Sequence, residues 1–143
     1  MELTVKQSNK RKKEYLNSYR DILELEKELS DEINRLRMDM QSPKSSALDS
    51  MPRRRNTEAD LSDYTVRIDT LLTRLQAAVD KRIMIRAEIG ELLEQLPERE
   101  NLLLYLRYIR GLSFRDISKR MQYEERQIYR IHGDALRHFP LRL

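Results

Sequence analysis

The sequence predicts an all-α protein in which a long antiparallel helical hairpin, coiled-coil-like in its packing, precedes a small helix-turn-helix domain. Two observations predict this class: apolar residues recur every three or four positions over two long stretches, and glycine (3) and proline (4) are scarce. Charged residues (36%) nearly match hydrophobic ones (39%), a balance typical of long amphipathic helices rather than of a thick core. We expect the hairpin within residues 1–96 and the helix-turn-helix domain within residues 97–143.

The first expected helix runs from Tyr15 to Met40. Its apolar residues are separated by steps of three or four, which places them on one stripe of a helix. The stripe consists of Tyr15, Tyr19, Ile22, Leu25, Leu29, Ile33, Leu36 and Met40. Its other faces are dense in charged residues, so we expect a solvated helix of about 30 residues, roughly 45 Å long.

Residues 41–57 form the expected loop. Serines surround Pro43 and Pro52, and each proline disfavours helical geometry in the residue before it. Asn56 or Thr57 then caps a second helix, which carries apolar residues at helical spacing from Leu61 to Leu96.

Two long amphipathic helices joined by a loop fold back most economically as an antiparallel pair. The second helix carries more apolar surface than one partner covers, at Leu71, Leu72, Ile83, Ile85, Leu92 and Leu93. Self-association into a dimer is the favoured cover for this surface, and docking of the C-terminal domain is the alternative.

A third helix begins at Pro97 and Glu98, and Gly111 is its expected C-terminal stop. We expect its inward face to consist of Leu102, Leu103, Leu106 and Ile109. Ser113 then caps a further short helix, with Asp116 three residues later in the first turn.

Residues 114–133 have the spacing of a helix-turn-helix. Five positions that must be apolar for two helices to cross are occupied by Ile117, Met121, Tyr123, Ile128 and Ile131, and Ser118 is the small residue at the closest approach. Gln122 stands at the turn, where a left-handed backbone costs a side-chain-bearing residue about 1 kcal/mol. Glu124 occupies the cap position of the second helix, where it is a weaker cap than serine or threonine.

The positive charge of the chain lies in the same region. Residues 97–143 hold ten basic and six acidic residues, and nine of the ten are arginine, whose forked donors suit phosphate and guanine. Four residues on the outward face of the second motif helix are candidate base-reading residues: Arg126, Gln127, Tyr129 and Arg130. Glu125 is the first exposed position, where a carboxylate accepts from cytosine but repels phosphate. On the first motif helix, Arg115, Lys119 and Arg120 are phosphate contacts or plain surface charges.

The run from Pro97 to Phe139 resembles region 4 of bacterial sigma factors and the helix-turn-helix of LuxR-type regulators, in the "GLS" before the motif and the "AL" that closes it. The order of a helical pair, a loop with Ser42-Pro43 and Met51-Pro52-Arg53, and the ending "YRIHGDAL" is similar to small phage and prophage proteins of the ArpU and RinA type. This resemblance implies a regulator of phage late or packaging genes.

Other chemistries find little support. The chain has no cysteine, its two histidines, His132 and His138, are not spaced as a metal pair, and no glycine-rich phosphate loop occurs. We therefore expect neither a catalytic site nor a cofactor. No stretch is apolar enough for a signal peptide or a membrane span, so we expect a protein of the bacterial cytoplasm. Two basic clusters, residues 10–13 and 53–55, either contact DNA beside the site or are merely solvated.

Three functions fit the sequence. The first is a dimeric, sequence-specific regulator that binds two half-sites on double-stranded DNA. The second is a DNA-packaging recognition protein similar to a small terminase subunit. The third is a sigma-like module that binds RNA polymerase rather than DNA, with Glu124 and Glu125 facing a basic partner.

Overall fold

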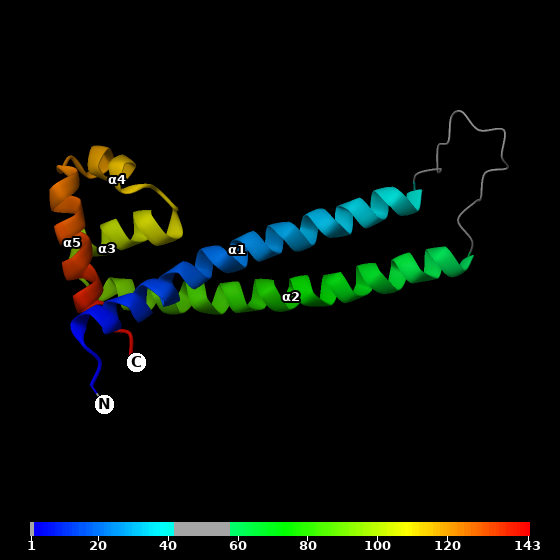
Figure 1. Cartoon of the computed structure of the whole chain (residues 1–143), viewed down its shortest axis with the longest axis horizontal. Coiled ribbons are helices and arrows are strands. Elements are labelled where there is room, and N and C mark those ends of the chain that lie inside the picture. The colour runs from blue at the N-terminus through cyan, green and yellow to red at the C-terminus, as the bar shows by residue number, and fades with distance from the viewer. Residues whose placement is uncertain (1, 42–57) are drawn as a thin grey trace. The chain divides into compact units, whose positions relative to one another are not determined.

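The computed structural model describes residues 2–41 and 58–143. These residues form helices and no strand, which confirms the all-α fold class (Figure 1). The elements are α1 (Val5–Gln41), α2 (Glu58–Glu94), α3 (Glu98–Leu104), the π-helical segment η1 (Tyr105–Ile109), α4 (Phe114–Met121) and α5 (Glu125–His138). The predicted loop at 41–57 and its candidate caps, Asn56 and Thr57, lie outside the described residues, except for Gln41, the last residue of α1.

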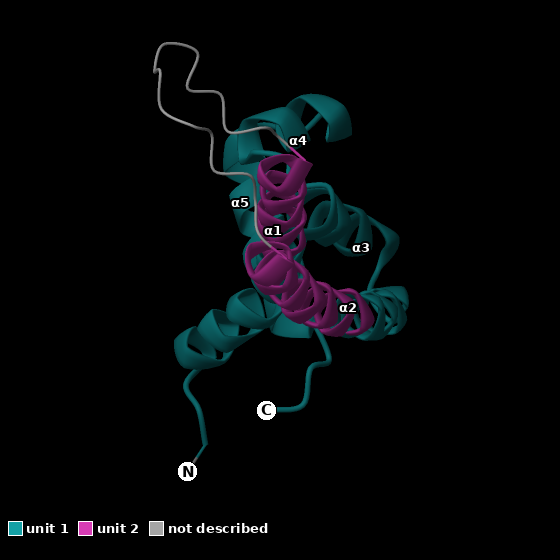
Figure 2. Ribbon diagram, turned by 90° about the vertical axis from the view of Figure 1, so that its right-hand side faces the viewer, with its two compact units in different colours: residues 1–23, 81–143 teal, residues 24–80 magenta. Residues whose placement is uncertain are grey.

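The described chain divides into two compact units, and each long helix contributes to both (Figure 2). Unit 1 comprises residues 1–23 and 81–143, and unit 2 comprises residues 24–80. The first turns of α1 and the last turns of α2 therefore belong to the same compact body as α3, η1, α4 and α5.

In unit 2, α1 and α2 pack through the predicted stripes. Leu29 and Ile33 of α1 meet Ile68 and Leu71 of α2 in a small buried cluster. The stripe prediction is wrong for Leu25, which is 45% exposed. A two-helix layer buries only a narrow strip on each helix, and Leu25 lies at its edge.

Helix α1 begins at Val5, well before the predicted start at Tyr15, because residues 4 and 7 cap it. The Thr4 backbone N–H donates to Gln7 Oε1 (3.1 Å), and the Gln7 N–H donates to Thr4 Oγ1 (3.2 Å). This reciprocal pair is a capping box. Leu16, which lies within the predicted helix but was left out of its stripe, is in the core of unit 1 with no exposed surface.

The core of unit 1 draws on every helix in it. Its largest fully buried side chains include Leu16 of α1, Ile89 of α2, Leu103 of α3, Ile117 of α4 and Ile128 of α5. The C-terminal helices therefore dock on the C-terminal end of α2. This docking is the alternative that the sequence offered for covering the surplus apolar surface of α2.

This docking covers only part of that surface. Leu93 is buried, and Ile85 and Leu92 are partly buried against the same core. Leu72 and Ile83 remain exposed, at 38% and 56%.

The predicted inward face of the third helix needs correction at Leu102. Leu103 and Leu106 are buried as predicted and Ile109 is partly buried, but Leu102 is 43% exposed and Leu104 is fully buried. The reason is the π-helical segment η1, whose wider turn shifts the phase of the apolar face relative to a straight α-helix. Gly111 ends the segment in a left-handed conformation, with φ +71°, as predicted.

Candidate nucleic-acid interface

The turn between α4 and α5 is fixed by the residues that the sequence singled out. Ser113 caps α4 by accepting the Asp116 backbone N–H at 3.1 Å. Gln122 adopts the left-handed conformation expected of the turn position, with φ 60° and ψ 41°. Ser118 bonds to Tyr123 twice: its Oγ donates to the Tyr123 carbonyl (2.6 Å), and its carbonyl accepts the Tyr123 N–H (3.1 Å). These two hydrogen bonds join α4 to the segment that precedes α5 and so fix the conformation of the turn.

The first turn of α5 has no side-chain cap. Glu124 is extended, with φ −68° and ψ 148°, and its side chain accepts no capping hydrogen bond. Glu125 follows in the first turn, where its negative charge interacts favourably with the helix dipole. Both glutamates are exposed.

One face of α5 is buried in the core, so the opposite face of the helix points to solvent. Ile117, Ile128 and Ile131 are buried, and Met121 and Tyr123 pack partly buried against them. All five predicted crossing positions are therefore confirmed.

On the opposite face of α5, Arg126, Gln127 and Arg130 are exposed. Arg126 and Arg130 are four residues apart, so they project from one face of the helix about one turn apart. The structure thus brings the two predicted arginine readers together.

Tyr129 is 56% exposed but not free, because its ring lies on Phe114, with ring centroids 4.7 Å apart. The same Phe114 ring also contacts a cation, because the Arg107 guanidinium carbon lies 4.2 Å from its centroid. Tyr129 therefore occupies the crossing of α4 and α5, with one side against Phe114.

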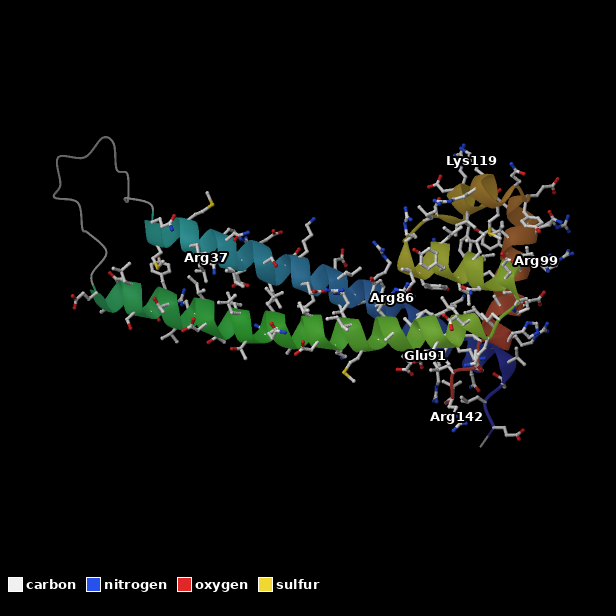
Figure 3. All side chains as sticks on the ribbon, turned by 180° about the vertical axis from the view of Figure 1, so that it is seen from behind. Arg37, Arg86, Glu91, Arg99, Lys119 and Arg142 are labelled. Atoms are coloured by element: carbon white, nitrogen blue, oxygen red, sulfur yellow. The ribbon has the colours of Figure 1, made fainter. Side chains whose placement is uncertain are left out.

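The basic residues of α4 form a second exposed set. Arg115, Lys119 and Arg120 are exposed, and the last two lie in the final turn of α4, where the helix dipole favours positive charge. Figure 3 shows the Lys119 side chain directed away from the helices.

Beneath α5 lies a buried polar pair that the sequence reasoning did not identify. His132 is 7% exposed, and its Nε2 lies 2.7 Å from the Tyr108 hydroxyl. Burial, with smaller contributions from the charges of Lys13 and Arg107, lowers the pKa of His132 to about 4, so the imidazole is neutral at neutral pH. Burial likewise raises the pKa of Tyr108 to about 12.

The C-terminal end of α5 is tied to α1 and α3. Lys12 Nζ donates to the carbonyls of Leu136 (2.9 Å) and Arg137 (3.2 Å), which are among the last carbonyls of the helix. His138 Nδ1 lies 2.9 Å from a carboxylate oxygen of Glu100, which is itself 5% exposed. These partners are far apart in the chain, so no local pattern marks them.

The structure describes one of the two predicted basic clusters, residues 10–13, and its members differ in exposure. Lys12 is buried against α5, so the interpretation of residues 10–13 as one DNA-facing cluster is wrong for this residue; desolvation lowers its pKa. Lys10, Arg11 and Lys13 are exposed. The cluster at 53–55 lies outside the described residues.

No group of acidic, histidine or cysteine side chains within residues 2–41 and 58–143 is arranged to hold a metal ion. Among the same residues, no helix has the length and apolar character needed to cross a membrane.

In a comparison with protein families, the model described as Sigma-70, region 4, matches residues 92–139. The match covers the end of α2 and all of α3, η1, α4 and α5, so this part of the chain is a sigma region 4-like helix-turn-helix, a resemblance that suggests DNA binding. Comparison with curated proteins and with solved structures gives no significant match.

Proposed function

We propose that the chain is a sequence-specific DNA-binding transcription regulator that inserts the N-terminal half of α5 into the major groove. The observation that carries this proposal is the pair Arg126 and Arg130, exposed one turn apart on a helix whose other face is fixed by Ile128 and Ile131. A rigid helix with forked donors on its free face is the arrangement that reads guanine O6 and N7.

The other candidate residues take subsidiary roles. Gln127 lies beside Arg126 and has the donor and acceptor needed for adenine. Tyr129 reaches a thymine methyl or a phosphate from its place on Phe114. Arg115, Lys119 and Arg120 contact phosphates and set the orientation of the module, while Glu125 accepts from cytosine N4.

We further propose that the chain acts as a dimer. A single module with glutamates at 124 and 125 binds DNA weakly, and a second module on the same duplex makes the next contact intramolecular. Exposed apolar residues on the long helices, Leu61 and Leu72 in unit 2 and Ile83 and Met84 in unit 1, support self-association. Two half-sites then lie about 34 Å apart.

The biological setting that we propose is control of late or packaging genes of a phage in a bacterial cytoplasm. The order of the segments, a long helical pair followed by a region 4-like domain, supports it through the similarity to ArpU and RinA type proteins. Recognition of a packaging site in the manner of a small terminase subunit uses the same DNA contacts, and a ring-shaped assembly in solution distinguishes it.

Binding to RNA polymerase is the second candidate. A shallow groove on unit 1, lined by Glu98, Arg99, Leu102 and Arg120 among others, exposes an apolar side chain between charges of both signs. Such a surface suits a protein partner. This candidate predicts that Arg126 and Arg130 are dispensable for activity and that the chain co-purifies with polymerase.

The test is selection of binding sites from a random duplex pool, followed by affinity measurements on the selected duplex over a salt series. We expect the native chain to enrich a two-part motif, and the variant Arg126→Ala with Arg130→Ala to lose the preference over a scrambled duplex. Arg37→Ala with Arg142→Ala removes the same charge from exposed sites elsewhere and serves as the control (Figure 3). The absence of an enriched motif refutes base reading through α5. So does a preference for the selected duplex that is the same in the Arg126→Ala, Arg130→Ala variant as in the Arg37→Ala, Arg142→Ala control.

A further inference from the structure

A basic groove lies between the first turns of α1 and the C-terminal half of α5. Its volume is about 750 Å³, and the residues that line it include Lys6, Lys10 and Lys13 of α1 and Gly133 and Leu136 of α5. Among the described residues that line it, none is acidic. Lys6, Lys10 and Lys13 follow at spacings of four and three, so they lie on one face of α1.

The two helices that form this groove, α1 and α5, are held together by contacts outside it. Lys12, on another face of α1, donates to the carbonyls of Leu136 and Arg137, and Leu16 is fully buried in the shared core. The Tyr15 and Phe139 rings add an aromatic contact, with centroids 6.4 Å apart. The three lysines of the groove are therefore held in register with α5.

Nothing in the fold requires a glycine at position 133. It lies within α5, its φ is not positive, and a Cβ built there meets no atom within 4 Å. A glycine inside a helix is less stable than alanine by about 1 kcal/mol, and neither packing nor backbone conformation calls for one here. What the missing side chain provides is room for close approach to the backbone of α5 from the groove.

The groove continues the proposed reading face of α5. Arg126 and Gly133 are seven residues apart, about 10 Å along the axis, which is comparable with the major-groove width of about 12 Å. Because the N-terminal residues of a recognition helix reach the base edges, the later turns pass the sugar-phosphate backbone. Asp134, beside Gly133, is paired with Arg137 at 2.9 Å, which reduces its repulsion of phosphate.

We propose that this groove binds the DNA backbone at the edge of the major groove, with Lys6, Lys10 and Lys13 contacting phosphates and Gly133 admitting the strand. The inference rests on the proposed function and extends it: the N-terminal helix, outside the region 4-like segment, becomes part of the DNA interface. Lysine suits this role because it acts as a point charge on phosphate and reads no base.

The test compares the native chain with the triple variant Lys6→Gln, Lys10→Gln and Lys13→Gln on the selected and the scrambled duplex. Each lost phosphate contact lowers the slope of log affinity against log salt by about 0.9, so three contacts lower it by about 2.7. Between 50 and 200 mM salt, the affinity of the native chain should therefore fall about 40-fold more than that of the variant. The preference for the selected duplex should not change.

The control is Lys27→Gln with Arg74→Gln and Lys81→Gln, which removes three exposed charges outside the groove. Its salt slope should stay close to that of the native chain, since long-range attraction is screened within about 10 Å. Gly133→Leu fills the groove without changing the charge. It should weaken binding to both duplexes at least tenfold and, because the strand no longer reaches the three lysines, lower the salt slope as the triple lysine variant does.

The outcomes separate the two proposals. An unchanged slope in the triple lysine variant, or a slope reduced equally in the control, overturns the groove proposal while sequence-specific binding stands. A native chain that prefers no sequence, but whose salt slope falls in the triple variant, refutes base reading and keeps the groove. A native chain that binds no duplex at 50 mM salt overturns both.

Discussion

Acidification should destabilise unit 1 through His132. Burial lowers the pKa of this imidazole to about 4, whereas in the unfolded chain it titrates at about 6.5. As the pH falls from about 6.5 to about 4, the unfolded chain binds a proton that the folded chain does not. The free energy of unfolding therefore falls over this range, and the imidazole has no such effect above it.

The gap between the two pKa values corresponds to about 3 kcal/mol when the titration is complete. Between pH 7 and pH 5, about 2 kcal/mol of this is lost. The variant His132→Gln removes the titrating group and keeps a polar side chain beside the Tyr108 hydroxyl. Urea unfolding at both pH values should show the native chain losing about 2 kcal/mol more than the variant, because groups other than His132 contribute equally to both.

Two results would refute this reasoning. One is an equal loss of stability in the native chain and in His132→Gln. The other is an NMR titration in which the imidazole resonance absent from the variant has its midpoint near 6.5, which would mean that the ring is solvated in the folded chain.

Three further predictions concern stability and are measured by urea unfolding. Gln122→Gly should raise the free energy of unfolding by about 1 kcal/mol, because the residue has φ 60°; a loss would show that the Gln122 side chain stabilises the turn. Leu16→Ala should lower it by about 2–5 kcal/mol, against less than about 1 kcal/mol for the exposed Leu25→Ala, and equal losses would contradict a shared core. Lys12→Met should lower it by about 1–3 kcal/mol, because it leaves the Leu136 carbonyl without its donor; an unchanged value would show that water satisfies that carbonyl.

Sequence reasoning succeeded where a local pattern determines the structure. The spacing of Ile117, Ile128 and Ile131 requires burial if two short helices are to cross, and all three are buried. The serine at 113 and the glycine at 111 have capping and stop roles that depend only on neighbouring backbone, and both are observed.

It failed where the deciding contact is distant in the chain. Lys12 belongs to a run of four basic residues, and only the proximity of the Leu136 carbonyl makes it a buried donor. Leu102 is exposed and Leu104 is buried because η1 changes the helical phase, and the run of leucines from 102 to 104 is compatible with either phase. The docking of α1 on α5 likewise depends on contacts more than 100 residues apart.

The two glutamates at the start of α5 fit a helix that is held mainly by its other parts. Glu124 makes no capping bond, whereas Ile128 and Ile131 are buried and Lys12 satisfies carbonyls at the far end. The N-terminal turn therefore does not depend on a serine or threonine cap. Under the proposed function, carboxylates at 124 and 125 repel phosphate and lower the affinity for every sequence. Because every duplex loses affinity in the same way, the glutamates lower the overall affinity and leave the difference between a duplex that engages Arg126 and Arg130 and one that does not to those two arginines.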